Sequence, residues 1–142
     1  MANNATNYAK YASPDPSSFM GSEWGGKVRA THDTYTFASA AADTEVNVGV
    51  LMPGEVFLTG WIIGADLGSA TTLQLGDAGD DDRYLAATTF TTEGQCTQCA
   101  KAEGVGYKNT TTSPIPIVLK TGVEEASGAV EVITSRLRLI NL

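Results

Sequence analysis

The sequence predicts an all-β protein, an antiparallel β-sandwich that follows an extended N-terminal arm. About eight short segments alternate apolar and polar residues with the period of a β-strand. Turn-forming residues separate these segments, among them 15 glycines and 5 prolines, and no segment has the apolar spacing of an amphipathic helix. Two packed sheets in jelly-roll order are the preferred arrangement, with another Greek-key sandwich as the alternative, because strand count does not determine topology.

Size and charge limit what the chain can be. Its 142 residues suit one domain, which we place at residues 27–142, after an arm of residues 1–26. A net charge of −7 would repel a phosphate backbone, so nucleic acid is not an expected partner. No apolar stretch is long enough to span a bilayer, and Met1–Lys10 has no secretory signal. We therefore expect a soluble protein made in the cytoplasm.

The N-terminal arm differs in composition from the rest of the chain. Residues 1–26 are rich in Asn, Ser, Ala and Pro, with aromatic residues at irregular spacing. Such a segment either packs on its own domain or docks on a partner. Because interface cores are enriched in aromatic side chains, we take Tyr8, Tyr11, Phe19 and Trp24 as the candidate partner-binding residues.

The first strands follow the arm. Residues 34–37 and 46–50 alternate apolar and polar positions, and Pro53-Gly54 marks a turn. Residues 55–65 are apolar on both alternating faces, as expected for a strand that is buried on two sides or covered by a partner. This segment is the predicted central strand, and its two glycines indicate bends or bulges.

Later strands are separated by longer loops. Residues 71–75 alternate, and a shorter strand begins at Tyr84 after an acidic loop. Residues 91–104 are expected to form a polar loop. Residues 115–119 alternate again, and Pro116 within them indicates an edge strand or a bulge.

The chain ends in one further predicted strand, residues 129–142. Ile133, Leu137 and Leu139 share one face of it, and Arg136 and Arg138 take the other.

The run Gly76–Tyr84 gathers carboxylates in a glycine-rich stretch, which suggests calcium. Its spacing does not fit a calcium loop, because Arg83 and Tyr84 follow the last aspartate where an EF-hand continues toward a bidentate Glu. The preferred interpretation is a solvated turn in which Asp side chains accept hydrogen bonds from nearby backbone N–H groups and Arg83 neutralises them. We expect no metal there.

Cys96 and Cys99 have the spacing of half a zinc site or of a redox motif. A second Cys pair is missing, and His32 is the only histidine. We expect two loop thiols, either free or joined after release into an oxidising medium. His32 precedes a predicted strand and is expected to be exposed or to cap it.

The sequence favours a binding protein over an enzyme. His32 alone would have to serve any catalytic triad, and no G-x-S-x-G turn is present. Gly104–Tyr107 lacks the third glycine and the flanking elements of a dinucleotide site. We therefore expect no catalytic residue and no cofactor.

Three central stretches resemble small virion structural proteins of tailed bacteriophages. They are Leu51–Val56 continuing through Thr59-Gly60-Trp61, then Thr72–Asp77, then Asp82–Ala87. In that family a Leu-Pro-Ala-Gly type of turn starts a strand, a Leu-x-x-Gly-Asp strand end follows, and an Asp-Arg-Tyr-Leu-Ala-Ala stretch comes after it. The resemblance covers about residues 45 to 140 and excludes the arm and the Cys96–Cys99 loop.

The resemblance implies a jelly-roll-like decoration or cement protein on the surface of the phage head. It would be made in the host cytoplasm, bind the major capsid protein over joints between subunits, and act as a closed homo-oligomer, with a trimer suiting threefold positions. Neck, tail and fibre-base proteins share such sheets and remain alternatives. A carbohydrate- or receptor-binding module is another, with Trp24 or Trp61 in a groove beside Asp80–Asp82. A hydrolase is the weakest, because the dense carboxylates lie in one loop.

Overall fold

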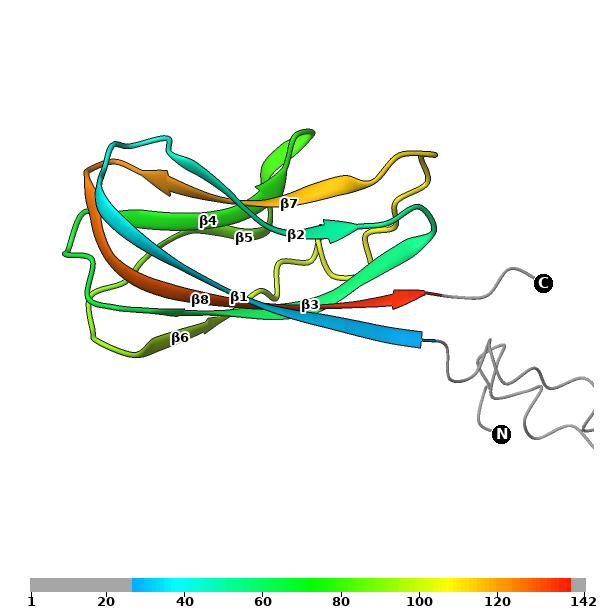
Figure 1. The fold of residues 1–142 in the computed structure, drawn as a ribbon, viewed down its shortest axis with the longest axis horizontal. Coiled ribbons are helices and arrows are strands. Elements are labelled where there is room, and N and C mark those ends of the chain that lie inside the picture. Colours follow the sequence, from blue (N-terminus) through cyan, green and yellow to red (C-terminus); the bar gives the residue numbers. More distant parts are fainter. Residues whose placement is uncertain (1–26, 139–142) are drawn as a thin grey trace, which may run out of the picture.

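The computed structural model describes residues 27–138. Within this range the chain forms two four-stranded antiparallel sheets and no helix, and so no helix capable of crossing a bilayer (Figure 1). The predicted all-β class and sandwich are confirmed. The four aromatic residues singled out in the arm, Tyr8, Tyr11, Phe19 and Trp24, lie outside the described residues.

Each sheet draws its strands from both halves of the chain. The first sheet has the order β1 (Lys27–Ala40), β8 (Ala126–Arg138), β3 (Glu55–Gly64), β6 (Gln95–Gln98). The second has the order β2 (Glu45–Leu51), β7 (Ile115–Gly122), β4 (Thr72–Asp77), β5 (Asp80–Thr89).

The strand pairing is that of a jelly roll. β1 pairs with β8, β2 with β7, β3 with β6 and β4 with β5, so the chain forms one long hairpin whose tip lies between β4 and β5. The doubled chain then rolls up, and β8 also pairs with β3 while β7 also pairs with β4. The jelly-roll order is therefore confirmed, and all these pairs are antiparallel.

Alternation along the strands builds the core between the sheets. On β3, Phe57 and Ile62 point inward and are fully buried, and on β4, Leu73 and Leu75 do the same. β3 lies between β8 and β6, which confirms it as an interior strand. A bulge lies between its residues 57 and 59, and Gly64 permits close packing because a Cβ there would lie 2.6 Å from Cδ1 of Phe90.

Three local predictions were wrong. β1 begins at Lys27, so His32 lies inside a strand and does not precede one. Asp80–Asp82 begin β5, since the connection from β4 consists of residues 78–79 alone. The expected polar loop at residues 91–104 contains the short strand β6, which is recognised only through its pairing with β3 because it has no alternating apolar residues.

Pro116 was expected to mark an edge strand or a bulge, but it lies within an interior strand. β7 as a whole lies between β2 and β4, so it is not an edge strand. β4 pairs only with residues 118–122 of β7, and Pro116 lies beyond that register, opposite Val50 of β2. The missing N–H of proline therefore falls where β7 has one neighbour among the described strands.

Candidate interaction surface

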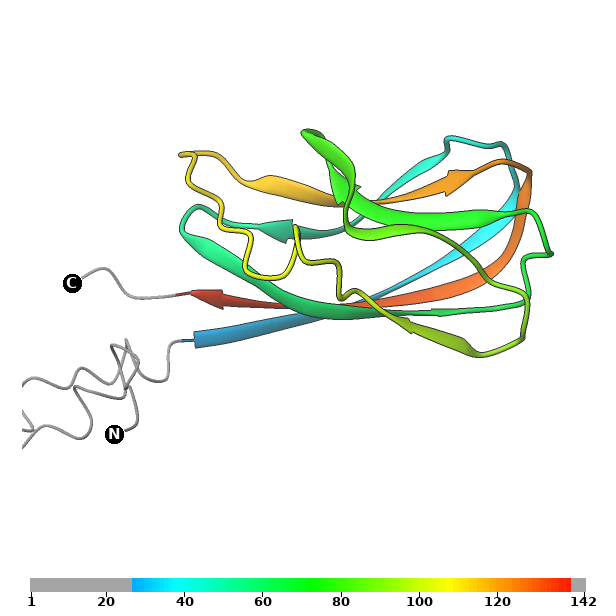
Figure 2. The same cartoon turned by 180° about the vertical axis from the view of Figure 1, so that it is seen from behind.

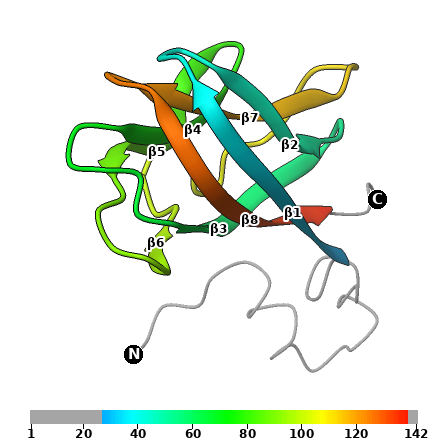
Figure 3. The same cartoon turned by 60° about the vertical axis from the view of Figure 1, so that its left-hand side comes forward.

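β1 is a long strand with an open edge. It has 14 residues, pairs with β8 on one side and has no strand beside it on the other among the described residues (Figure 3). Phe37 is its one buried residue, and Val28 and Tyr35 are 62% and 42% exposed. A long exposed edge offers unpaired backbone N–H and C=O groups to another chain.

The opposite margin of the same sheet is formed by β6, a strand of four residues, and by the connection that follows it. β6 pairs with the second half of β3, and the connection after β6 runs along the side of the sandwich in Figure 2. This connection continues the coverage along the first half of β3, where Phe57 N–H donates to the carbonyl of Tyr107 at 2.8 Å and Asn109 N–H donates to the carbonyl of Glu55 at 3.0 Å. The two edges of this sheet therefore differ in length, with 14 residues in β1 and four in β6.

The outer side of the first sheet presents apolar side chains. In the register, Leu137 lies between Val28 and Val56, which makes one apolar row across three strands. A second row places Ile133 between His32 and Trp61. We call the outward-facing set the apolar face: Val28, Val56, Trp61, Ile63, Ile133 and Leu137.

The outer side of the second sheet is different. Lys120 lies there between two carboxylates, with Nζ 2.9 Å from Asp81 Oδ2 and 3.4 Å from Asp43 Oδ1. Gln74 donates its side-chain N–H to the carbonyl of Asp81 at 3.3 Å. Such a polar, ion-paired surface is suited to solvent, whereas a nearly uncharged apolar sheet face is suited to contact with protein.

The start of β1 is held against the rest of the sandwich by the side chain of Arg29. Arg29 Nη2 lies 2.6 Å from Glu55 Oε1 and also donates to the carbonyl of Val50 at 2.9 Å. Met52 N–H donates to the same carboxylate at 2.7 Å. Burial alone would raise the pKa of Glu55, but the hydrogen bonds from Arg29 and Met52 and the nearby positive charges outweigh it and hold that pKa below its ordinary value.

Behind this contact lies a fully buried arginine. Arg136 Nη2 donates to the hydroxyls of Thr31 at 2.6 Å and Thr134 at 2.7 Å, while its Nε and Nη1 have no hydrogen-bond partner among the described residues. Burial lowers the pKa of Arg136, and the charge of Arg29 adds to this effect. The two arginine positions at the end of β8 were correctly assigned to one face, and the structure shows that this face is the interior at Arg136.

A pocket of about 260 Å³ opens beside these groups. Three cations, Lys27, Arg29 and Arg138, line it together with the apolar side chains of Val28 and Met52. Its remaining lining residue is the carboxylate already held by Arg29. In a chain of net charge −7, this end of the first sheet is locally basic.

The turn between β4 and β5 is held by Asp77. Its Oδ1 accepts from Gly79 N–H at 2.9 Å, and its Oδ2 accepts from Arg83 Nε at 2.8 Å and from the Tyr84 hydroxyl at 3.1 Å. Burial alone would raise the pKa of Asp77, but these hydrogen bonds and the charge of Arg83 lower it overall. The expected pattern of Asp-to-backbone bonds with arginine neutralisation is present, on the buried Asp77 at the end of β4.

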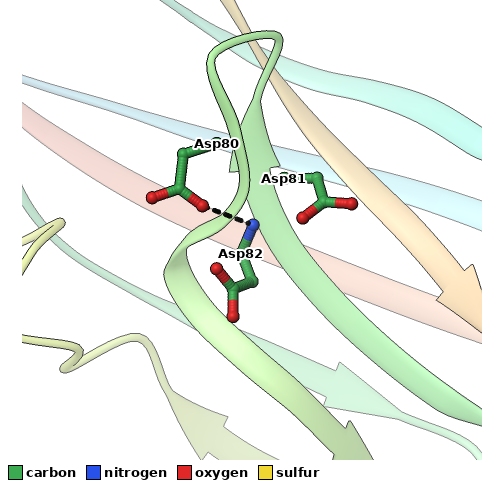
Figure 4. Close-up of side chains that lie close together, drawn as sticks. All are labelled: Asp80, Asp81 and Asp82. Carbon is green, nitrogen blue, oxygen red and sulfur yellow. Dashed lines mark hydrogen bonds between the residues drawn. The ribbon is translucent and has the colours of Figure 1, made fainter.

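Asp80, Asp81 and Asp82 lie close together at the start of β5 (Figure 4), with ligand atoms within 4.8 Å of one another. Two of them are engaged by lysines: Lys101 Nζ lies 2.9 Å from Asp82 Oδ1 and Lys120 Nζ lies 2.9 Å from Asp81 Oδ2. These ammonium groups neutralise charge that a cation would otherwise neutralise, so the cluster is an ion-pair network.

The remaining candidate residues do not come together. Cys96 is exposed on β6 and Cys99 is buried directly after it, both are free, and burial raises the pKa of Cys99 to about 12. His32 is exposed on β1, with Nε2 3.8 Å from Glu131 Oε1. Trp61 lies on the apolar face of the first sheet, whereas Asp80–Asp82 belong to the second, so the groove imagined between them is not formed.

Part of the apolar face was predicted from the sequence. The segment 55–65 was expected to be buried on two sides or covered by a partner, and its outer residues Val56, Trp61 and Ile63 lie half-buried on the apolar face. The shared face of Ile133 and Leu137 was also recognised. The sequence did not show that this face points outward, because that depends on which side of β8 the second sheet lies.

No protein-family model matches this chain, and no curated protein matches it either. Among solved structures, a chain of the capsid asymmetric unit of cyanophage Pam1 is similar, with a TM-score of 0.68 and 22% identity over 81% of this chain and 87% of that one. A chain of the capsid of Ralstonia phage GP4 has a TM-score of 0.60 and 19% identity, covering 82% and 87%. A chain of the capsid structure of Helicobacter pylori bacteriophage KHP30 has a TM-score of 0.60 and 13% identity, covering 80% and 89%. The jelly roll described above is thus a fold that this protein shares with chains of three bacteriophage capsids.

Proposed function

We propose that this protein is a bacteriophage virion structural protein, a decoration or cement protein that binds the major capsid protein and stabilises the head. The observation that carries the proposal is the fold, shared over about four-fifths of the chain with chains of three phage capsid structures at TM-scores of 0.60 to 0.68. The phage-like turn and strand-end stretches of the sequence support the same assignment.

The mechanism is burial of apolar surface against several capsid subunits at once. Each Å² of apolar surface removed from water contributes roughly 25 cal/mol, so a protein that spans a joint raises the free energy needed to separate the subunits it touches. Copies joined as a homotrimer would bind with several contacts together, which slows release. In this proposal Tyr8, Tyr11, Phe19 and Trp24 of the arm supply partner contacts.

The net charge and the arrangement of the ionisable side chains within residues 27–138 fit this binding role on the capsid surface. The net charge of −7 disfavours the packaged nucleic acid as a partner. The carboxylates clustered on β5 are engaged by lysines, and the lone histidine, His32, is exposed on an edge strand. These features support a structural role and not an enzymatic one.

The test is co-sedimentation with phage heads stripped of their accessory proteins, using the full chain and a chain lacking residues 1–26. We expect saturable binding of the full chain at a fixed ratio to capsid subunits, and loss of that binding when the arm is removed. Failure of the full chain to bind heads at any concentration would overturn the cement role and direct the search to the neck, the tail or a cell-surface glycan. Binding that survives removal of the arm would assign attachment to the sandwich.

A further inference from the structure

Two features of the first sheet are not explained by the fold. The outer side carries the apolar face, whose residues other than Val28 are half-buried, and no third layer of strands or helices lies over it among the described residues. The edge of β1 beside it is open over 14 residues, whereas the opposite edge strand of the sheet, β6, has only four. Val28, which is 62% exposed, lies where the two features meet.

The chemistry of this surface defines what it can bind. An open strand edge is satisfied by another extended chain, which supplies N–H and C=O groups at the same spacing. The apolar rows beside the edge require that this chain carry apolar or aromatic side chains. Glu131 and His32 are the ionisable side chains of the outer side within residues 28–36 and 129–137, so an incoming segment needs few charges.

The 26 residues that precede β1 have this character. They contain Tyr8, Tyr11, Phe19 and Trp24, which are four of the eleven aromatic residues of the chain, and their charged side chains are one Lys, one Asp and one Glu. When extended, 26 residues span about 85 Å at roughly 3.3 Å each. The edge of β1 needs about 45 Å at the same rise, so the segment is long enough to cover it and to reach a neighbour.

We propose that residues 1–26 of one copy lie along the β1 edge and the apolar face of a neighbouring copy. The choice of a neighbour rests on the proposed function, in which copies are held together as a closed oligomer. A segment that leaves one copy at Lys27 and pairs with the next makes a head-to-tail contact, and such contacts form a ring when the rotation between successive copies closes. The arm aromatics then bind another copy of this chain, and exchange of arms creates the multivalent unit that attaches to the head.

Light scattering of the purified chain, without heads, tests the exchange. We expect an oligomer, with a mass of at least two chains of 14.8 kDa each. The variants Val28→Glu and Ile133→Glu, which place a carboxylate on the apolar face, are expected to weaken association at least about tenfold and to release monomers. Val118→Glu makes the same change on the outer side of the second sheet and is expected to keep the oligomer.

Folding does not confound this test. Val28 is 62% exposed, so a glutamate there leaves the core intact, and circular dichroism checks both variants. A full chain that is monomeric at all concentrations would overturn the proposal, and so would an oligomer that resists both substitutions. Because heads are absent, either outcome leaves the cement role to be decided separately by co-sedimentation.

Trp24 provides a direct readout of where the arm lies. The chain has two tryptophans, so Trp61→Phe leaves Trp24 as the one tryptophan. Because Trp61 belongs to the apolar face, light scattering must first show that Trp61→Phe, which keeps an aromatic side chain there, has the same mass as the unsubstituted protein. In the oligomer, acrylamide is expected to quench Trp24 weakly, and adding Ile133→Glu is expected to increase the quenching. A monomer in which Trp24 stays shielded would show that the arm packs on its own copy, and a Trp24 that is fully accessible in an oligomer would show that other surfaces hold the copies together.

Mixing two variants distinguishes an arm that binds a neighbouring copy from an arm that packs on its own copy. The variant Trp24→Ala combined with Phe19→Ala cannot donate its arm, and Ile133→Glu cannot receive one, so each alone is expected to be monomeric. Mixed together, the two retain one intact contact, from the arm of the second to the face of the first, and a heterodimer is expected. No change on mixing would contradict exchange.

Discussion

At the scale of single residues, two arginines on the inner side of the first sheet differ in what they contribute. Arg29 is partly exposed and forms a close ion pair with the buried carboxylate of Glu55. Arg136 is fully buried, and among the described residues its side chain donates only to two threonine hydroxyls. A buried charge without a close counter-charge is costly, whereas a buried carboxylate depends on its partner.

We therefore predict opposite effects for the same substitution at these two positions. Arg136→Met should leave the free energy of unfolding unchanged or raise it by up to about 2 kcal/mol, because the hydroxyls of Thr31 and Thr134, 3.1 Å apart, remain bonded to each other. Arg29→Met should lower it by about 2 kcal/mol, because Glu55 stays buried without its partner. Urea unfolding of the three proteins measures both changes. A large loss of stability in Arg136→Met would contradict this prediction and show that the nearby carboxylates of Glu55 and Asp33 compensate the charge of Arg136.

Asp77 makes the free energy of unfolding depend on pH. Its pKa in the folded protein lies below the ordinary value of 3.8, so the unfolded chain takes up the proton first as the pH falls. The contribution of Asp77 is therefore complete above that ordinary value and is lost as the pH falls through the folded value. We predict that Asp77→Asn lowers the free energy of unfolding at pH 7 and that its difference from the unsubstituted protein shrinks below about pH 4. Unfolding curves from pH 7 to pH 2 measure it, and a difference independent of pH would contradict the assignment.

At the scale of the strand, the alternation of apolar and polar residues predicted those strands that have an apolar face. β3 was recognised as central because it is apolar on both sides, and the structure places it between two strands. β6 was missed because its four residues, Gln95–Gln98, have no such pattern and depend on pairing with β3. On β8 the two faces were separated correctly, but their orientation is a tertiary property, since Val130, Val132 and Arg136 all point inward.

Close packing between the ends of β3 and β5 gives a prediction at this scale. A Cβ added at Gly64 would lie 2.6 Å from the ring of Phe90, which is fully buried. Gly64→Ala should therefore lower the free energy of unfolding by about 1–3 kcal/mol, because the ring must shift. Phe90→Leu shortens the opposing side chain, so the double variant should lose less than the sum of the two single losses. Thermal unfolding of the four proteins measures the coupling, and strict additivity would show that the two sites do not meet.

At the scale of the whole molecule, the sequence predicted the class and the sandwich but left the topology open. Turn signals between alternating segments identify strands, whereas their order in the sheets depends on contacts such as that of β1 with β8, more than 90 residues apart at Thr34 and Glu131. The candidate binding residues of the arm could be chosen only by composition. The β1 edge and the apolar face could be identified only in the structure, because the position of both sheets decides which side of a strand points outward.

Attachment to the head gives the last prediction, since it depends on the assembled protein. If exchange of arms holds the copies together, Ile133→Glu removes multivalency as well as one contact, and its apparent affinity for stripped heads should fall by about 100-fold or more. Val118→Glu changes the net charge equally on the other sheet and should bind heads as the unsubstituted protein does. Co-sedimentation over a range of protein concentrations measures both affinities. A monomeric Ile133→Glu protein that still binds heads with full affinity would place the capsid contact elsewhere on the sandwich and separate self-association from attachment.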